Sequence, residues 1–301
     1  MIIDPISIPS TDGVILGVYK YEAEVISPER NSRPHVLFSH ATGFHGRCFD
    51  PVAESLCRDF DCTSFDYRGY GDSYVSKDWP VTWQGYGEDA LAVARTLSSR
   101  NQIIGVGHSM GGTGLIMAAL AEPNLFRALI IYEPIVFPSE VRDLRRTSST
   151  PNALVEGARR RRTTFSSRAE AYANYSSKPP MNSFDERSLH AYVDYGFNDA
   201  DGAVVLKCRP ELEARTYEMG AVHETWERLH SLSVPTWVVA GEFQPSQPSS
   251  WAQLIAKEIP NTKFIQWPDV GHFGPMQQPD RLAQIVREVD DLTRANTEFK
   301  D

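Results

Sequence analysis

Short apolar runs alternate with amphipathic stretches through the first 137 residues of the chain. The runs have the length of buried strands, and the stretches between them space their apolar residues as helices do. We predict strands at 14–21, 35–39, 62–67, 102–106 and 128–132, and helices at 50–58, 88–98 and 111–120. Apolar strands separated by helices are typical of a parallel sheet covered on both faces, so the pattern predicts an α/β fold.

The pattern changes near Pro138. From there to about His230 the sequence shows helix signals and no convincing strand. The segments 167–170 and 183–186 both begin with serine and end with glutamate, which is the spacing of a capping box at a helix start. We therefore expect this stretch to form a helical insertion.

After the insertion, strands and helices alternate again. We predict strands at 235–240 and 263–267, and helices at 249–258 and 279–294. The expected domains are an α/β core of residues 1–137 and 231–301 and a helical cap or lid of residues 138–230.

Composition excludes several classes of function. The chain has 301 residues and a formal net charge of -9, which argues against a nucleic-acid surface because such surfaces are basic. No apolar run approaches the length of a membrane span. The four cysteines lack paired metal-ligand spacing, so we expect free buried thiols, no metal and no cofactor.

The first residues, Met1 to Pro5, lack the basic and apolar segments of a signal peptide. Together with the unpaired cysteines, this predicts a cytoplasmic location. The oligomeric state is left open by the sequence.

Ser109 lies in the motif Gly107-His108-Ser109-Met110-Gly111, between the expected strand 102–106 and a helix of small residues. A strand, a sharp turn and a helix form the context of a nucleophile elbow. The turn strains the backbone at the serine, and small flanking residues meet that demand. We predict that Ser109 is a catalytic nucleophile.

A serine hydroxyl needs a base that accepts its proton. His272 follows the last expected strand in a loop flanked by Gly271 and Gly274, and this loop opens at the same sheet edge as Ser109. We predict that His272 is the base. His108 is adjacent to the serine but is expected to point away from it.

The base in turn needs an acid that orients it. The turn after strand 235–240 holds Gln244 where an aspartate is usual, and a glutamine cannot offset the imidazolium charge. Glu133 ends strand 128–132 and is expected at the same edge as Ser109. We favour Glu133 as the acid, with Glu242 as the alternative.

An oxyanion hole needs two backbone N–H donors. Met110 directly follows the nucleophile and is expected to supply one. The loop after strand 35–39 reads His40-Ala41-Thr42-Gly43-Phe44 and is expected to supply the other. We favour the amide of Thr42, with Ala41 as the alternative.

The chain resembles the α/β-hydrolase superfamily in four segments: 39–43, 66–73, 107–112 and 271–273. Their order and spacing match the family. The resemblance implies an eight-stranded, mostly parallel sheet with a helical cap inserted after strand six. The acid is missing from its commonest place, which resembles family members that supply it after strand six.

A serine at the elbow suits acyl transfer, whereas the dehalogenases and epoxide hydrolases of this family use an aspartate. We predict a serine hydrolase that cleaves a carboxylic ester or lactone through an acyl-enzyme intermediate. The alternatives are an acyltransferase or a carbon–carbon bond hydrolase on the same residues, and a ligand-binding protein without turnover.

The expected cap is rich in aromatic residues, and some of them are candidates for a pocket that takes a small hydrophobic or aromatic substrate; these include Tyr172, Tyr192 and Tyr195. The four consecutive arginines at 159–162 are expected to be mostly solvated or in salt bridges. At most one of them can face the site, because consecutive residues point around a helix.

Overall fold

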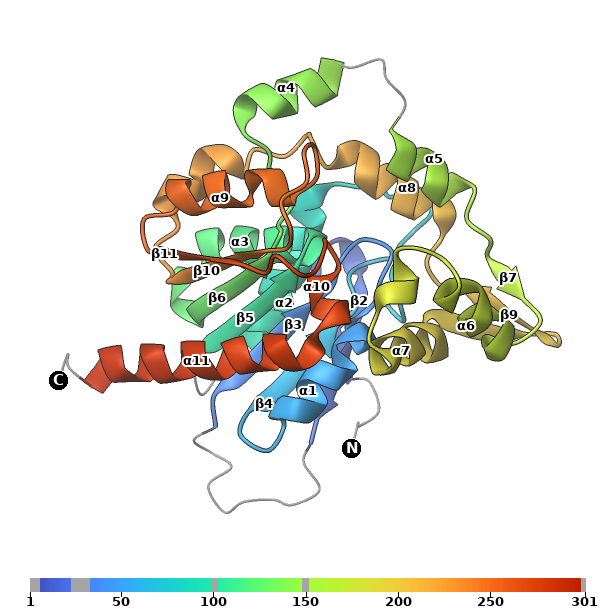
Figure 1. The fold of residues 1–301 in the computed structure, drawn as a ribbon, viewed down its shortest axis with the longest axis horizontal. Helices are drawn as coiled ribbons and strands as arrows, with labels where there is room; N and C mark the ends of the chain where they lie inside the picture. Colours follow the sequence, from blue (N-terminus) through green and yellow to red (C-terminus); the bar gives the residue numbers. More distant parts are fainter. Residues whose placement is uncertain (1–5, 23–32, 99–101, 148–151, 299–301) are drawn as a thin grey trace.

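An eight-stranded sheet forms the centre of the computed structural model, which describes residues 6–22, 33–98, 102–147 and 152–298 (Figure 1). The strand order is β1-β2-β4-β3-β5-β6-β10-β11. Its strands are β1 (Ile6–Pro9), β2 (Ile15–Tyr21), β3 (His35–Ser39), β4 (Asp61–Phe65), β5 (Ile103–His108), β6 (Phe126–Tyr132), β10 (Thr236–Ala240) and β11 (Thr262–Gln266). β1 and β2 pair antiparallel with their neighbours, and the strands from β4 to β11 pair in parallel.

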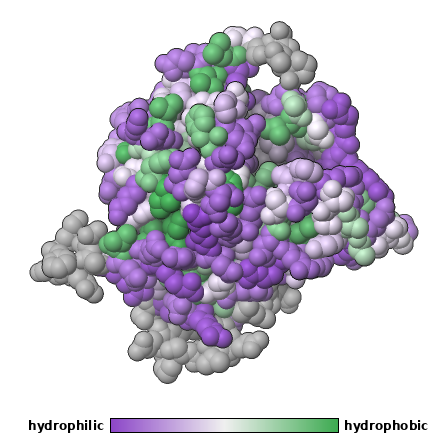
Figure 2. All heavy atoms as spheres, in the orientation of Figure 1, coloured by the Kyte–Doolittle hydropathy of each residue, from purple (hydrophilic) through white to green (hydrophobic). Residues whose placement is uncertain are grey.

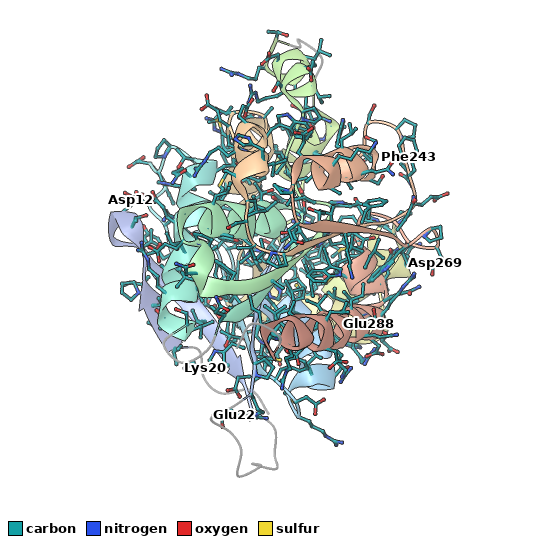
Figure 3. The ribbon with its side chains drawn as sticks, turned by 90° about the vertical axis from the view of Figure 1, so that its left-hand side faces the viewer. Asp12, Lys20, Glu22, Phe243, Asp269 and Glu288 are labelled. Carbon is teal, nitrogen blue, oxygen red and sulfur yellow. The ribbon has the colours of Figure 1, made fainter. Side chains whose placement is uncertain are left out.

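Helices cover both faces of this sheet. The helices of the core are α1 (Asp50–Leu56), α2 (Trp83–Leu97), α3 (Met110–Ala121), α9 (Ser249–Glu258), α10 (Gly274–Gln277) and α11 (Pro279–Glu298). Figures 1 and 3 show α1 and α11 on one face and α2 and α3 on the other. The predicted α/β fold with a mostly parallel eight-stranded sheet is therefore confirmed. The interpretation of Met1 to Pro5 concerns residues outside the described part of the chain.

Burial follows the apolar pattern that defined these elements. Every residue of the central strand β5 is buried, whereas no residue of the edge strand β11 is fully buried. α3 is buried on nearly all sides because it is apolar around its whole circumference. The parallel strands thus bring their carboxyl ends, and the loops that follow them, to one edge of a rigid core.

The segment between β6 and β10 lies outside the central sheet, and we call residues 138–230 the inserted segment. Its helices are α4 (Ser139–Thr147), α5 (Ala153–Arg159), α6 (Arg168–Ser176), α7 (Glu186–Gly196) and α8 (Pro210–Met219). Short 3-10 turns complete the described part of the chain at Thr11–Gly13, Gly46–Phe49, Pro123–Leu125, Met181–Ser183 and Trp226–Ser231.

The expectation that the inserted segment contains no strand is wrong. A second, antiparallel sheet has the order β7-β9-β8, formed by β7 (Thr164–Phe165), β8 (Phe197–Ala200) and β9 (Ala203–Leu206). β7 has only two residues, and β8 is polar and exposed at three of its four positions, so neither shows an apolar run. Asp201 and Gly202 join β8 to β9 with positive φ angles of 38° and 78°. An Asp-Gly pair is a hairpin signal, and it could have revealed this turn.

One of the two expected capping boxes forms as a cap. The Ser167 side chain accepts the N–H of Glu170 at the start of α6. The other is wrong: Ser183 belongs to a 3-10 turn, and α7 is capped instead by Asp185, whose carboxylate accepts the N–H of Arg187. Asp185 directly precedes the first helical residue, so its carboxylate reaches the free N–H groups of the first turn.

The surface in Figure 2 is mainly hydrophilic, with hydrophobic residues in separate patches rather than one continuous band. Exposed large apolar side chains are scattered over several elements, as Leu144 on α4 and Leu254 on α9 illustrate. No helix within the described residues is long and apolar enough to cross a membrane.

Candidate active site

Ser109 occupies the turn between β5 and α3 in a strained conformation. Its φ and ψ angles are 55° and -117°, in the left-handed region that a residue with a side chain rarely adopts. Such strain costs of order 1–3 kcal/mol and persists where the surroundings hold it. The N–H of Ser109 donates to the carbonyl of Tyr132 at 2.9 Å, which fixes the turn to the end of β6.

The glycines around this turn are required by close contact between backbones. A Cβ at Gly111 would lie 2.1 Å from the carbonyl oxygen of Ser39, and a Cβ at Gly107 would lie 2.6 Å from the Cα of Gly112. Both obstacles are backbone atoms, which cannot move aside cheaply. The small residues on which the elbow motif depends are therefore a steric necessity of this turn.

Glu133 directly follows β6 and is completely buried. Its φ of 43° turns the chain away from the sheet. One carboxylate oxygen, Oε1, accepts the N–H of Gly241 at 2.8 Å, and the other, Oε2, lies 2.6 Å from Nδ1 of His272. The carboxylate therefore joins the ends of β6 and β10 to the loop after β11.

His272 lies in that loop, and its backbone is held from two sides. The Tyr132 hydroxyl donates to the carbonyl of Gly271 at 2.6 Å, and Nε2 of His108 is 2.8 Å from the carbonyl of His272. Because Nδ1 faces Glu133, the other ring nitrogen, Nε2, is left to act on a substrate or a nucleophile.

The structure brings His272 and Glu133 into contact and places Ser109 on the neighbouring strand end. Within the described residues, no hydrogen bond joins the hydroxyl of Ser109 to His272. Catalytic hydrogen bonds in ligand-free enzymes are often long and tighten when substrate binds.

Among the described residues, Glu242 forms no hydrogen bond or ion pair with this histidine. Its side chain is exposed, and the residue is held by a backbone hydrogen bond from its N–H to the carbonyl of Val270 at 2.7 Å. Of the two carboxylates considered from the sequence, only Glu133 contacts His272.

The loop after β3 is held in shape by His40. Its Nδ1 lies 2.8 Å from the carbonyl of Ala41, and its Nε2 accepts the N–H of Tyr67 at 3.0 Å. These bonds require the neutral ring, and burial lowers the pKa of His40 to about 3. The N–H of Phe44 closes the turn on the same Ala41 carbonyl, with Gly43 at a positive φ of 81°.

Thr42 lies within this closed turn and is buried, as is Met110 at the start of α3. The first N–H groups of a helix have no acceptor inside the helix, so the Met110 amide is free for an anion. Ser39 and His40 connect the two elements, because their carbonyls pack directly against Gly111.

A model of the Alpha/beta hydrolase family matches residues 36–285, which is most of the chain. The chain belongs to this family. A related sequence is 3-oxoadipate enol-lactonase 1 of Acinetobacter baylyi, which is 22% identical over 266 residues, with 87% of this chain and 90% of that protein covered.

Solved structures of this hydrolase family share the fold. E-2-(acetamidomethylene)succinate hydrolase has a TM-score of 0.76 at 20% identity, covering 95% of this chain and 99% of that one. The peroxisomal alpha-beta-hydrolase Lpx1 of Saccharomyces cerevisiae also has a TM-score of 0.76, at 17% identity, covering 97% and 88% of the two chains.

Four aromatic rings connect the inserted segment to the loops of this hydrolase core, and we call Phe44, Phe184, Tyr192 and Phe273 the aromatic cluster. The ring of Phe44 lies 5.2 Å from Tyr192 and 5.7 Å from Phe273, and Phe184 lies 5.5 Å from Phe273. Phe273 adjoins His272, and Ser109 is nearly inaccessible. Phe184 and Tyr192 of the inserted segment thus pack against Phe44 and Phe273 of the predicted catalytic loops.

The three tyrosines considered as pocket residues have different surroundings. Tyr192 is buried against Phe44 and His45 of the loop after β3. Tyr172 stacks on His190 within the inserted segment, and Tyr195 is 38% exposed beneath the guanidinium of Arg47. Of the three, Tyr192 is therefore the one in contact with the predicted oxyanion loop.

His108 and Tyr132 were missed as positioning residues by the sequence analysis. Both hold the carbonyls of the His272 loop, and their rings pack on each other at 5.7 Å. The position of His108 beside the nucleophile was the one available signal. Burial lowers the pKa of His108 well below its usual value, so this ring stays neutral.

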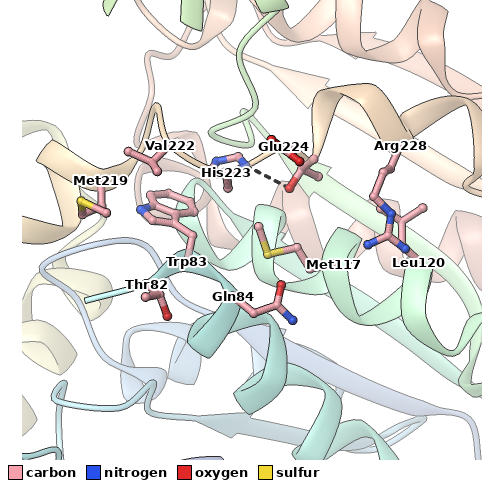
Figure 4. Close-up of a pocket in the computed structure, with 11 residues that line it drawn as sticks. Thr82, Trp83, Gln84, Met117, Leu120, Met219, Val222, His223, Glu224 and Arg228 are labelled. Atoms are coloured by element: carbon pink, nitrogen blue, oxygen red, sulfur yellow. Dashed lines mark hydrogen bonds between the residues drawn. The ribbon is translucent and has the colours of Figure 1, made fainter. Parts of the chain in front are cut away.

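A separate pocket of about 340 Å³ lies where α2, α3 and the end of the inserted segment meet (Figure 4). His223 and Trp83 stack on one another in it with ring centroids 4.8 Å apart. None of the predicted catalytic residues lines it. Its lining residues are Thr82, Trp83, Gln84, Met117, Leu120, Met219, Val222, His223, Glu224, Thr225 and Arg228.

Among the described residues, no group of three or more His, Cys, Asp or Glu side chains is arranged to hold a metal ion. All four cysteines are buried thiols.

Proposed function

We propose that the protein is a serine hydrolase that cleaves a carboxylic ester or lactone through an acyl-enzyme intermediate. The observation that carries this proposal is the 2.6 Å contact between Nδ1 of His272 and the buried carboxylate of Glu133. A histidine oriented by a carboxylate, beside a serine at a strained strand-to-helix turn, is the arrangement that acyl transfer requires.

In the proposed mechanism, Nε2 of His272 accepts the proton of the Ser109 hydroxyl as its oxygen attacks the substrate carbonyl. Glu133 holds the ring in the tautomer that leaves Nε2 unprotonated, and it offsets the charge of the imidazolium that forms. His272 then donates the proton to the leaving alkoxide. A water molecule activated by the same ring hydrolyses the acyl-enzyme.

The oxyanion of the tetrahedral intermediate is proposed to bind the N–H groups of Met110 and Thr42. Met110 stands at the positive end of the α3 dipole, which favours negative charge there. Removing one such donor typically costs about 3–4 kcal/mol of transition-state stabilisation. The bond between His40 and Ala41 supports the role of Thr42, because it fixes the turn that contains this amide.

We further propose that the inserted segment is a cap over a small-molecule site. Its aromatic residues Phe184 and Tyr192 pack on Phe44, which supplies an apolar wall beside the oxyanion loop. The relationship to an enol-lactonase supports a cyclic or linear ester as the substrate class.

A panel of p-nitrophenyl esters, aryl esters and lactones tests this function. We expect measurable hydrolysis of at least one member by the wild-type protein and none above background by Ser109→Ala. Turnover that survives in Ser109→Ala would assign the chemistry to another nucleophile. A burst of alcohol release before steady state would report the acyl-enzyme directly.

A further inference from the structure

The arginine run 159–162 contains one member, Arg161, that is only partly exposed. Arg159 pairs with Glu211 and Glu218, and Arg162 pairs with Glu170, which confirms the expectation of salt bridges. Arg161 instead turns inward: its Nη1 donates to Oε2 of the buried Glu213 at 2.7 Å.

The pair of Arg161 and Glu213 packs against the proposed oxyanion loop. A Cβ at Gly43 would lie 2.6 Å from Oε1 of Glu213 and 3.4 Å from Nη1 of Arg161. Gly43 directly follows Thr42, so the guanidinium stands one residue away from the proposed oxyanion donor. Within the described residues, Nη1 is the one side-chain nitrogen of Arg161 in a hydrogen bond, and a guanidinium has five N–H donors.

Two tyrosines beside this pair have unused hydroxyls. Tyr192 is 1% exposed and packs on Tyr175 with ring centroids 5.4 Å apart. By hydrogen-bond geometry, neither hydroxyl has a partner among the described residues, and the two hydroxyls are close enough for Tyr192 to lower the pKa of Tyr175. Burial raises the pKa of both phenols, and the nearby positive charge of Arg161 opposes that rise.

An unpaired hydroxyl in a buried position costs free energy, so it points to a missing ligand. The groups left free here are the remaining guanidinium N–H donors and two phenolic O–H donors. A carboxylate is the ligand that fits this set, because its two oxygens accept several hydrogen bonds and match the planar guanidinium.

We propose that Arg161, Tyr175 and Tyr192 form a binding subsite for a carboxylate that the substrate carries away from its scissile bond. This inference rests on the proposed function and narrows it to esters or lactones that bear a free carboxylate. Glu213 holds Arg161 in place while the subsite is empty, which avoids an unpaired buried charge. The substrate carboxylate then occupies the free edge of the guanidinium.

Calorimetry tests the subsite without turnover. The protein is the Ser109→Ala variant, which is not expected to cleave esters, and the probes are monomethyl glutarate and dimethyl glutarate. These two compounds differ in the free carboxylate, which only the first carries. We expect the monomethyl ester to bind about tenfold more tightly or better, because hydrogen bonds to a charged group are the stronger class.

Two further variants on the same background locate the effect. Tyr192→Phe removes only the unpaired hydroxyl and is expected to weaken monomethyl glutarate binding about tenfold. Arg161→Gln combined with Glu213→Gln removes both charges without leaving either one unpaired, and it should abolish the preference for the carboxylate. Arg160→Gln changes the exposed neighbour in the same run and should leave both affinities unchanged.

Equal affinity for the two probes, binding of neither probe, or a preference that survives the loss of Arg161 and Glu213 would overturn the subsite. These results are distinct from a failure of the proposed function. A wild-type protein that binds the monomethyl ester selectively but hydrolyses no ester would retain the subsite and lose the hydrolase mechanism. A protein that hydrolyses charged and uncharged esters equally well would retain the hydrolase mechanism and lose the subsite.

Discussion

The acid of the proposed site was the hardest residue to predict from the sequence, because the usual acid position holds Gln244. The prediction of Glu133 as the acid depends on one property of parallel sheets: strand ends that share an edge bring residues from different strands together. The Glu133 carboxylate spans the N–H of Gly241 and the ring of His272, so its orientation is fixed at both oxygens.

We expect Glu133→Gln to lower kcat/KM by roughly 1,000-fold or more, because an amide both loses the charge and stabilises the wrong tautomer of the histidine. The matched control is Glu242→Gln, in which the same chemical change falls on an exposed side chain and should have little effect. Steady-state kinetics on any ester that the wild type hydrolyses compares the two. A larger loss in Glu242→Gln would move the acid to the end of β10.

His40 predicts a pH dependence of stability. Burial lowers its pKa in the folded state to about 3, against 6.5 for the exposed ring. Below pH 6.5 the unfolded chain therefore binds a proton that the folded chain does not. The stability that the neutral His40 ring contributes is fully present above pH 6.5 and is lost as the pH falls. At pH 5 the loss amounts to about 2 kcal/mol.

Urea unfolding of the wild type and of His40→Gln at pH 7.5 and pH 5 measures this effect. The variant should have a lower free energy of unfolding than the wild type at pH 7.5. The difference between the two proteins should shrink by about 2 kcal/mol at pH 5, because residue 40 of the variant does not titrate. The other buried histidines are common to both proteins and cancel in the difference. A deficit that is the same at both pH values would contradict the assignment of a neutral ring.

At the scale of elements, the strand–turn–helix unit of the nucleophile depends on glycine at 111. A Cβ there would meet the Ser39 and His40 carbonyls at 2.1 and 2.6 Å. We expect Gly111→Ala to destabilise the protein by about 3 kcal/mol or more, since overpacked backbone cannot relax.

The control for that substitution is Gly157→Ala, because a Cβ at Gly157 in α5 would meet nothing within 4 Å. Replacing a helical glycine that has free space around it by alanine should raise the free energy of unfolding by about 0.5–1 kcal/mol. Thermal or urea unfolding of both variants separates the two cases. Equal stabilities would mean that the elbow is looser than its contacts indicate.

The elements differ in how well the sequence predicts them. Central strands such as β5 are predicted because burial on both faces demands an unbroken apolar run. β7 and β8 are not, because two residues, or four with three exposed, carry no such run. Arg161 shows a related limit: α5 ends at Arg159, so the three arginines that follow it are not helical, and which of them turns inward depends on the contacts of the folded protein.

At the scale of the whole molecule, the inserted segment and the core meet at the aromatic cluster, and Ser109 is nearly covered. We therefore expect substrate entry to require movement of the inserted segment. Phe184→Ala removes contacts to Phe44 and Phe273, each worth about 0.5–1.5 kcal/mol, and the loss of both should make opening roughly 5- to 150-fold more frequent.

The rate of fluorophosphonate labelling at low probe concentration reports this opening. Phe184→Ala should be labelled faster than the wild type. Tyr172→Ala, in the same segment but stacked on His190, should be labelled at the wild-type rate. If the two variants behave alike, the aromatic cluster does not control access.

The site of fluorophosphonate attachment, measured by intact-protein and peptide mass spectrometry, tests directly whether Ser109 is the nucleophile. We predict one adduct on Ser109 in the wild type, no adduct in Ser109→Ala, and strongly slowed labelling in His272→Ala. An unlabelled wild type, or an adduct that persists after Ser109 is replaced, would contradict this prediction.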